Sequence, residues 1–196
     1  MPNNDPTAAR LPAVSLTVLL ATGDEGQASD AAPACLISAL ESHGFSVRVI
    51  ECVGGEVSTR DVRLGARLKQ ARSAIDGKLV LAGFSRGARV SAGMIEPLHA
   101  VAFVALAYPF HARTDPNPFG LTALQKVNVP TLLCQGTRDS HGNRQQIEGY
   151  DLPASLALHW LEDANHALRP RPSSGLDQAT QLTEAATRIV DFLRSL

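Results

Sequence analysis

A single serine stands between two glycines in the segment "LAGFSRGARV", where an apolar run ends. The five residues from Gly83 to Gly87 match the G-x-S-x-G pattern of a nucleophile elbow, a tight strand-to-helix turn that exposes a serine hydroxyl. Glycines suit this turn because the two backbones pass too closely for side chains. Ser85 is therefore a candidate nucleophile, provided that the chain also supplies a base and an acid.

The residues for that base and acid come later in the chain. A serine hydroxyl needs a base to take its proton and an acid to orient that base. Asp139 in "QGTRDSHG" and His166 in "LEDANHAL" each follow an apolar run. The order Ser85, Asp139, His166 is that of an α/β-hydrolase. Asp163 is the alternative acid. Asp139 is favoured because it follows the strand before the one that leads to His166, which is where an α/β-hydrolase usually supplies its acid.

An anionic intermediate on Ser85 also requires an oxyanion hole, which is a pair of hydrogen-bond donors. We expect one donor to be the backbone N–H of Arg86 and the other to be the amide of Asp24, with that of Glu25 as the alternative, in the loop after the first strand. The carboxylates of Asp24 and Glu25 would oppose catalysis if they pointed inward. The Arg86 side chain is expected either to meet an anionic substrate group or to face solvent.

Three residues at strand ends are predicted to line a substrate pocket. Phe84 precedes the nucleophile, and Tyr108 and His111 belong to "YPFHA", which follows another apolar run. Ligand pockets combine apolar walls with a few polar groups, and these side chains offer both. Core packing is the alternative for Tyr108, and simple exposure is the alternative for His111.

Regular elements must bring these residues together. Six apolar segments are predicted to be strands: 14–21, 46–52, 78–84, 101–108, 130–136 and 156–162. Helical spacing of apolar residues occurs in segments 30–44, 59–75 and 182–196. This alternation predicts a single doubly wound, mostly parallel sheet of about six strands, with helices on both faces. Ligands of such sheets bind beyond the carboxyl ends of the strands, where the candidate residues lie.

Length and composition favour one domain. A chain of 196 residues suits a single core, and we predict a flexible N-terminus over 1–12 and one domain over 13–196. A net charge of -1 and a charged fraction of 19% predict neither a nucleic-acid partner nor a membrane partner. No apolar run is long enough for a membrane helix, and no signal peptide is recognisable, so a cytoplasmic location is expected.

The cysteines do not indicate a metal site. Cys35, Cys52 and Cys134 lie in apolar surroundings and lack the spacing of zinc ligands. We expect them to be reduced core thiols. The sequence predicts no metal and no cofactor, and it leaves the oligomeric state open.

Four stretches together resemble a known family: "LVLAGFSRGARV", "YPFHA", "VPTLLCQGTRDSHG" and "LHWLEDANHAL". They are similar to small lidless α/β-hydrolases related to dienelactone hydrolase. The group typified by a metazoan testis-expressed protein and by the hydrolase-like scaffold subunit of a histone-acetyltransferase complex is the most similar. The resemblance covers roughly 15–196 and implies an α/β-hydrolase fold, no large lid and a triad of Ser85, Asp139 and His166.

The chain departs from this family at two places. Thr22 and Gly23 stand where members usually carry a His-Gly pair, which bears on the oxyanion hole. Ser85 stands where dienelactone hydrolase itself has a cysteine, so that enzyme's substrate is not carried over. Two functions follow as hypotheses. The first is a serine hydrolase, of the carboxylesterase or thioesterase type, for a small-molecule ester or acyl substrate. The second is a non-catalytic binding or scaffold module, which the acidic loop residues favour.

Overall fold

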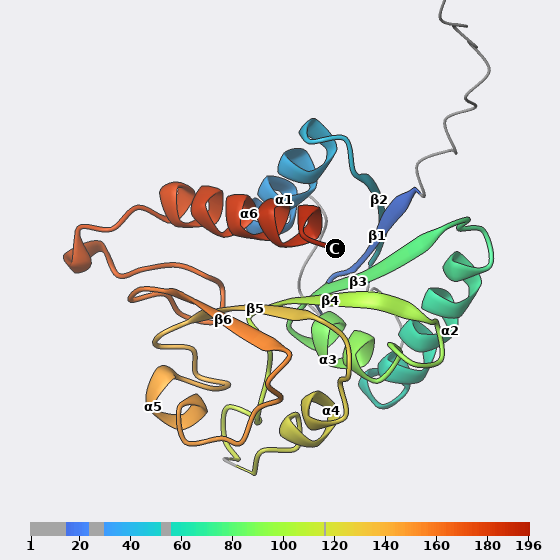
Figure 1. Ribbon diagram of the computed structural model, residues 1–196. Coiled ribbons are helices and arrows are strands. Elements are labelled where there is room, and N and C mark those ends of the chain that lie inside the picture. The colour runs from blue at the N-terminus through green and yellow to red at the C-terminus, as the bar shows by residue number, and fades with distance from the viewer. Residues whose placement is uncertain (1–14, 24–29, 52–55, 116) are drawn as a thin grey trace, which may run out of the picture.

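The computed structural model describes residues 15–23, 30–51, 56–115 and 117–196. One sheet of six parallel strands forms its centre, in the order β2-β1-β3-β4-β5-β6 (Figure 1). The strands are β1 (Leu16–Ala21), β2 (Ser46–Ile50), β3 (Lys78–Phe84), β4 (Ala100–Leu106), β5 (Thr131–Gly136) and β6 (Leu156–Leu161). The predicted parallel sheet is confirmed, and the strand boundaries lie close to the predicted ones.

Helices cover both faces of the sheet. On one face α1 (Ala31–Ser42) and α6 (Gln178–Arg194) lie side by side (Figure 1). The opposite face carries α2 (Arg60–Arg72), α3 (Arg86–Ala92), α4 (Leu121–Gln125) and α5 (Arg144–Ile147). Two short 3-10 turns, η1 (Val57–Thr59) and η2 (Pro172–Ser174), precede α2 and α6.

The sheet is apolar on both faces, which explains the uninterrupted apolar runs in the sequence. In β3, Val80 and Ala82 belong to the core cluster that contains the buried side chains of α1 and α6. The neighbouring Leu79 and Leu81 belong to the cluster shared with α2 and α3. Successive strand residues point to opposite faces, so a strand covered by helices on both sides must be apolar at every position.

The C-terminal helix shows how local sequence sets an element. The side chain of Asp177 caps α6 by accepting a hydrogen bond of 2.8 Å from the backbone N–H of Thr180. The apolar residues Leu182, Ala186 and Ile189 recur at helical spacing in α6 and form a stripe that is buried against the sheet. This stripe fixes α6 beside α1, across the face opposite to the elbow helix α3.

The connection from β4 to β5 is short. Over its described part, residues 107–115 and 117–130, the only helix is α4, which has five residues. No large lid is inserted there, as the family resemblance implied.

The described helices also include none that combines the length and the apolar character needed to cross a membrane. The predicted flexible N-terminus, 1–12, lies outside the described residues.

Two of the three cysteines can be placed. Cys134 is buried in β5, and burial raises the pKa of its thiol to about 12. Cys35 is half-buried in α1, and both are free thiols. The prediction of reduced core thiols fits Cys134 best, because a buried thiol with a raised pKa forms little of the reactive thiolate. Cys52 lies outside the described residues.

Candidate active site

Ser85 occupies a strained corner between β3 and α3. Its backbone has φ 50° and ψ -121°, a conformation that residues other than glycine rarely adopt. The N–H of Ser85 donates to the carbonyl of Leu106 at 3.0 Å, which ties the corner to the end of β4. Strain of this kind persists only where the surrounding structure enforces it, and it is common at functional sites.

Close backbone packing around the corner explains the glycines of the motif. A Cβ on Gly83 would lie 2.5 Å from the nitrogen of Ala88, and one on Gly87 would lie 2.3 Å from the carbonyl oxygen of Ala21. Real Cβ atoms do not approach backbone this closely, so any side chain would displace α3 from β1 and β3. The predicted elbow geometry is therefore present.

The loop after β1 passes next to the nucleophile. A Cβ on Gly23 would lie 3.2 Å from the Cβ of Ser85, so only glycine fits without a shift. The chain departs from the family's His-Gly pair at Thr22 but keeps the glycine at the point of closest approach. Asp24, the predicted second oxyanion donor, lies outside the described residues.

A chain of hydrogen bonds joins the three predicted catalytic side chains. The hydroxyl of Ser85 lies 2.9 Å from Nε2 of His166. Nδ1 of His166 lies 2.9 Å and 3.0 Å from the two carboxylate oxygens of Asp139, which is fully buried. Because a carboxylate only accepts hydrogen bonds, Nδ1 carries a proton, and Nε2 of the neutral ring is free to accept the serine proton.

Asp163, the alternative acid, is committed to other partners. Its carboxylate accepts hydrogen bonds from the backbone N–H of Arg171 at 2.8 Å and from Nε of Arg171 at 3.1 Å. Nε of Arg138 lies 2.9 Å from the same carboxylate. The hydrogen bond from the Arg171 side chain is the largest cause that lowers the pKa of Asp163, to about 2. The structure thus places Asp139, and not Asp163, against His166.

His141 packs against His166, a contact that no sequence motif predicted. The two ring centroids are 4.2 Å apart. Nδ1 of His141 donates to the carbonyl of His111 at 3.0 Å, and its backbone N–H donates to Asp139 at 2.8 Å. Burial and the neighbouring His166 lower the pKa of His141, although the bond to His111 opposes them. The lowered pKa favours the neutral form of the His141 ring, which packs against His166.

The structure corrects the predicted pocket wall at Tyr108. The ring of Tyr108 is fully buried, and its hydroxyl donates to the carbonyl of Gly120 at 2.9 Å, so it belongs to the core. Phe84 is 8% exposed and packs into the core shared with α1 and α6. His111 is 5% exposed, and its Nδ1 lies 2.8 Å from the carbonyl of Ala112. All three leave little surface for a ligand.

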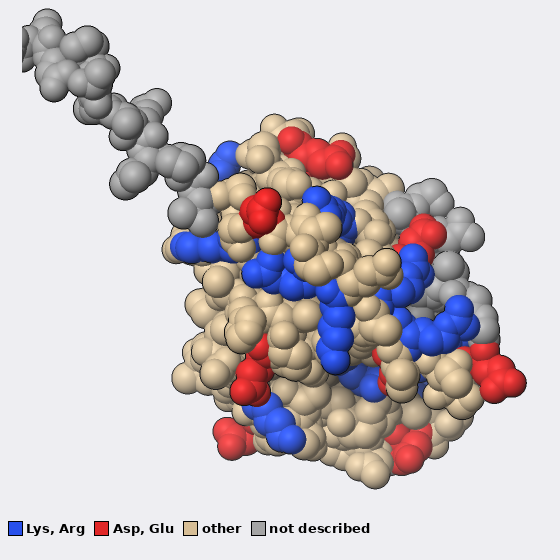
Figure 2. All heavy atoms as spheres, turned by 90° about the vertical axis from the view of Figure 1, so that its right-hand side faces the viewer, with Lys and Arg blue, Asp and Glu red and all other residues tan. Residues whose placement is uncertain are grey.

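The side chain of Arg86 takes part in an internal ion pair. Arg86 and Arg89 bond the two carboxylate oxygens of Asp61 on α2, at 2.8 Å and 2.6 Å. Partial burial raises the pKa of Asp61, but hydrogen bonds from both arginines outweigh it, and the net shift is downward. Figure 2 shows Lys and Arg side chains gathered in a band over the face that carries α2. The pairing links α2 to the elbow helix, so Arg86 is not simply solvent-facing.

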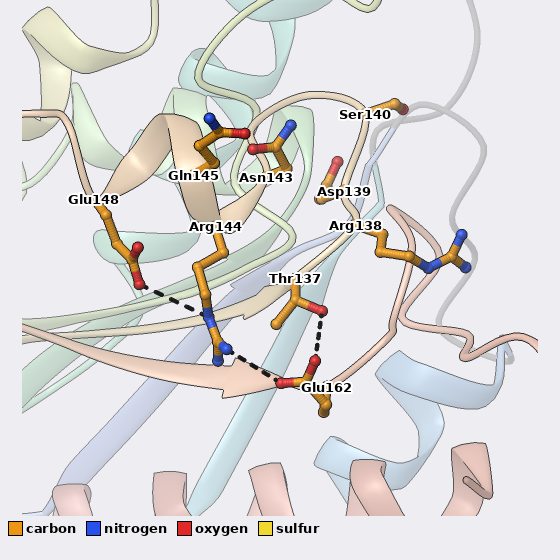
Figure 3. A pocket seen from close by; sticks show the side chains of 9 residues that line it. All are labelled: Thr137, Arg138, Asp139, Ser140, Asn143, Arg144, Gln145, Glu148 and Glu162. Carbon is orange, nitrogen blue, oxygen red and sulfur yellow. Dashed lines mark hydrogen bonds and ion pairs between the residues drawn. The ribbon is translucent and has the colours of Figure 1, made fainter. Parts of the chain in front are cut away.

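A cavity of about 600 Å³ opens beside Asp139 (Figure 3). It is lined by Thr137, Arg138, Asp139, Ser140, Asn143, Arg144, Gln145, Glu148 and Glu162. Arg144 lies 3.9 Å from Glu148 and 3.3 Å from Glu162, so its charges largely pair with one another. The lining includes the acid of the hydrogen-bond chain but not its serine or histidine.

In the described ranges, no group of three or more His, Cys, Asp or Glu side chains is arranged to hold a metal ion.

Comparisons with known proteins agree with this architecture. A family model described as alpha/beta hydrolase domain matches residues 59–194. A putative hydrolase of the α/β superfamily from Xanthomonas campestris pv. campestris has a TM-score of 0.72 and 19% identity, over 92% of this chain and 99% of that chain. Est1E from Butyrivibrio proteoclasticus has a TM-score of 0.70 and 14% identity, over 93% of this chain and 90% of that one.

A third similar structure is an α/β serine hydrolase without a lid from Xanthomonas campestris. Its TM-score is 0.62 at 20% identity, over 93% of this chain and 83% of that one. Identities this low show a shared fold alone, and the six-stranded parallel sheet is that fold. The family model covers well over half of the residues. The chain therefore belongs to the alpha/beta hydrolase domain family.

Proposed function

We propose that the protein is a serine hydrolase of the carboxylesterase or thioesterase type that acts on a small ester or acyl substrate. The observation that carries this proposal is the continuous hydrogen-bond chain from Ser85 through His166 to the buried Asp139. Each contact falls within 3.0 Å, and each partner has the chemistry that acyl transfer needs. A strained elbow beneath Ser85 supports the same role.

The reaction follows from the positions of the protons. Nε2 of His166 takes the proton of Ser85 as the serine oxygen attacks the substrate carbonyl carbon. The tetrahedral intermediate collapses, the leaving group receives that proton from His166, and an acyl-enzyme ester remains on Ser85. A water molecule then attacks the ester with His166 as the base, which releases the carboxylic acid and restores the serine. Asp139 holds Nδ1–H of His166 throughout and stabilises the imidazolium.

The oxyanion of each intermediate would lie between two backbone donors. We propose the N–H of Arg86, at the start of α3, as the first donor and the N–H of Asp24 as the second. The close approach of Gly23 to Ser85 supports a donor from this loop. The ion pair with Asp61 draws the Arg86 side chain toward α2.

The proposed substrate is small because no large lid covers the carboxyl ends of the strands in the part of the chain that the structure describes. A bulky apolar chain would stay exposed to water over an uncovered site. Est1E, one of the similar structures, is described with ferulic acid bound. For this chain, we propose a small-molecule ester as the binding partner. The cytoplasmic location of the protein and its division into domains stay predictions.

A non-catalytic binding or scaffold module is the second candidate. The acidic residues Asp24 and Glu25 favour it, because inward-pointing carboxylates would repel an oxyanion. The chain also resembles the group of the testis-expressed protein and the scaffold subunit, and we propose that it is a member of that group. This resemblance supports the binding or scaffold module. The two functions differ in one observable, which is turnover that depends on Ser85.

Steady-state hydrolysis of p-nitrophenyl acetate tests this proposal. We expect Ser85→Ala to lower kcat by at least about 10³-fold, because the covalent pathway is lost. Ser91→Ala is the matched control, since Ser91 is buried in α3, the helix that Ser85 directly precedes. Equal turnover by wild type and Ser85→Ala, or none by either, would favour the binding module.

A further inference from the structure

Gln135 is a polar side chain in the middle of the core. It lies in β5 between apolar neighbours and has no exposed surface. Its Oε1 accepts a hydrogen bond from the backbone N–H of Tyr108 at 2.7 Å. Its Nε2 lies 3.2 Å from the carbonyl oxygen of Tyr108, 3.1 Å from that of Gly142 and 3.0 Å from Oδ2 of Asp139. A buried amide is costly unless it is bonded, and this one is bonded at both ends.

These contacts join two loops at the candidate site. Tyr108 follows the end of β4, while Asp139 and Gly142 belong to the loop after β5. The amide of Gln135 acts toward Tyr108 as a backbone peptide unit would, accepting from its N–H and donating to its carbonyl. One side chain therefore extends the pairing of the two strands into the loop that holds the acid.

Both oxygens of Asp139 receive fixed donors. Oδ2 is 3.0 Å from Nε2 of Gln135 and 2.9 Å from Nδ1 of His166. Oδ1 accepts from the backbone N–H of His141 at 2.8 Å. The backbone donor is fixed by the fold, whereas the donor at Oδ2 depends on the residue type at position 135. An apolar residue there would remove the Nε2 donor, and among the described residues Oδ2 would keep only its hydrogen bond with Nδ1 of His166.

We propose that Gln135 is a positioning residue, whose neutral N–H holds the Asp139 carboxylate in the orientation that His166 requires. This inference rests on the proposed function. Neutrality is as important as reach, since an ionised side chain at this position would change the charge beside Asp139. Gln135 touches neither Ser85 nor the substrate carbon, so it acts only through Asp139.

Gln135→Glu tests this role because it preserves size and changes charge. Two carboxylates about 3 Å apart do not both ionise readily. In this variant the carboxylate introduced at position 135 and that of Asp139 therefore retain one proton between them. We expect kcat at pH 7 to fall at least about tenfold, the acid limb of the pH profile to move up by about one unit or more, and KM to change by less than about threefold. Activity should recover as pH rises and the pair loses its proton.

Two controls separate this effect from general damage to the core. Gln181→Glu makes the same exchange at a buried glutamine of α6 that bonds the carbonyl of Glu162, and it should leave the pH profile unchanged. Asp139→Asn should stay inactive at every pH, because its amide cannot regain a charge. Thermal unfolding at each assay pH verifies that all the variants are folded.

A second readout does not depend on turnover. The His166 ring can be titrated by NMR in Ser85→Ala protein with and without Gln135→Glu. We expect the His166 midpoint to move to higher pH in the double variant, because the proton retained by the two carboxylates is shared with the neighbouring imidazole and leaves only at higher pH. Absence of Ser85-dependent turnover would overturn the proposed function alone. A Gln135→Glu variant with wild-type kcat and acid limb, or an unmoved His166 midpoint, would overturn the role of Gln135.

Discussion

Asp139 and Asp163 occupy equivalent positions but have opposite surroundings. Each follows the carboxyl end of a strand, β5 for Asp139 and β6 for Asp163. Asp139 accepts hydrogen bonds from neutral donors and from His166. Asp163 is paired with the guanidinium groups of Arg138 and Arg171. An aspartate among neutral donors keeps its charge available to a histidine, whereas one between two arginines has its charge already paired.

The second aspartate still serves the site indirectly. Arg138 precedes Asp139 in the chain, and its Nε donates to the carbonyl of Asp163 at 3.0 Å. The N–H of Asp163 donates to the hydroxyl of Thr137 at 2.8 Å. These bonds tie the loop that carries Asp139 to the loop that carries His166. We infer that Asp163 fixes the distance between the two loops without touching the imidazole.

The largest difference between the two aspartates should appear in turnover. Asp139→Asn keeps the shape but removes the charge and favours the wrong imidazole tautomer, so we expect kcat to fall by about 10³ to 10⁴-fold. Ester hydrolysis at pH 8 measures this loss. A kcat within about tenfold of wild type would contradict the assignment of Asp139.

Asp163→Asn should have a far smaller effect on turnover. The variant loses the ion pairs with Arg138 and Arg171 but leaves every hydrogen bond of His166 in place, so we expect kcat to fall less than about tenfold. The measurement is the same assay, run beside Asp139→Asn. If Asp163→Asn lost more activity than Asp139→Asn, the roles of the two residues would have to be exchanged.

The smallest expected effect is a pH dependence of the free energy of unfolding that Asp163 contributes. The folded pKa of Asp163 is about 2, below the ordinary value of about 3.9 for an unfolded aspartate. A depressed folded pKa stabilises the protein above the unfolded pKa, and this contribution disappears as pH falls from about 4 to about 2. The free-energy difference between wild type and Asp163→Asn, measured by urea unfolding, should therefore be largest above pH 5.

That pH dependence has a clear contrary result. Asp61 and Asp177 also have lowered pKa values, but they occur in both proteins and cancel in the difference. A difference that stayed constant from pH 6 to pH 2 would mean that Asp163 gains nothing from its arginines. In that case the two loops would be held by packing and backbone bonds alone.

Much of the fold follows from local pattern. Each strand is an apolar run because both faces of the sheet are covered, so the sequence marks strand positions closely. The order of Ser85, Asp139 and His166 also predicted which acid meets the histidine. The strand positions and the choice of acid depend on short segments and on the order of residues along the chain, and both can be read from a sequence.

The details of the site depend on distant contacts and could not be read in advance. The ring of His141 packs at a tilt against the ring of His166, 25 positions later in the chain. Tyr108 was predicted to face a pocket, but it is buried in the core and its hydroxyl bonds the carbonyl of Gly120. Gln135 did leave a signal, as a single polar residue near the end of the apolar run "TLLCQG". A buried amide in a strand needs partners, and their identity required the structure.

We propose that Ser85 is an activated nucleophile. Labelling with a fluorophosphonate probe, read by intact mass on wild type, Ser85→Ala and Ser91→Ala, detects such a serine. We expect one adduct on wild type and on Ser91→Ala and none on Ser85→Ala. Folded wild-type protein that forms no adduct, or an adduct that persists in Ser85→Ala, would contradict it.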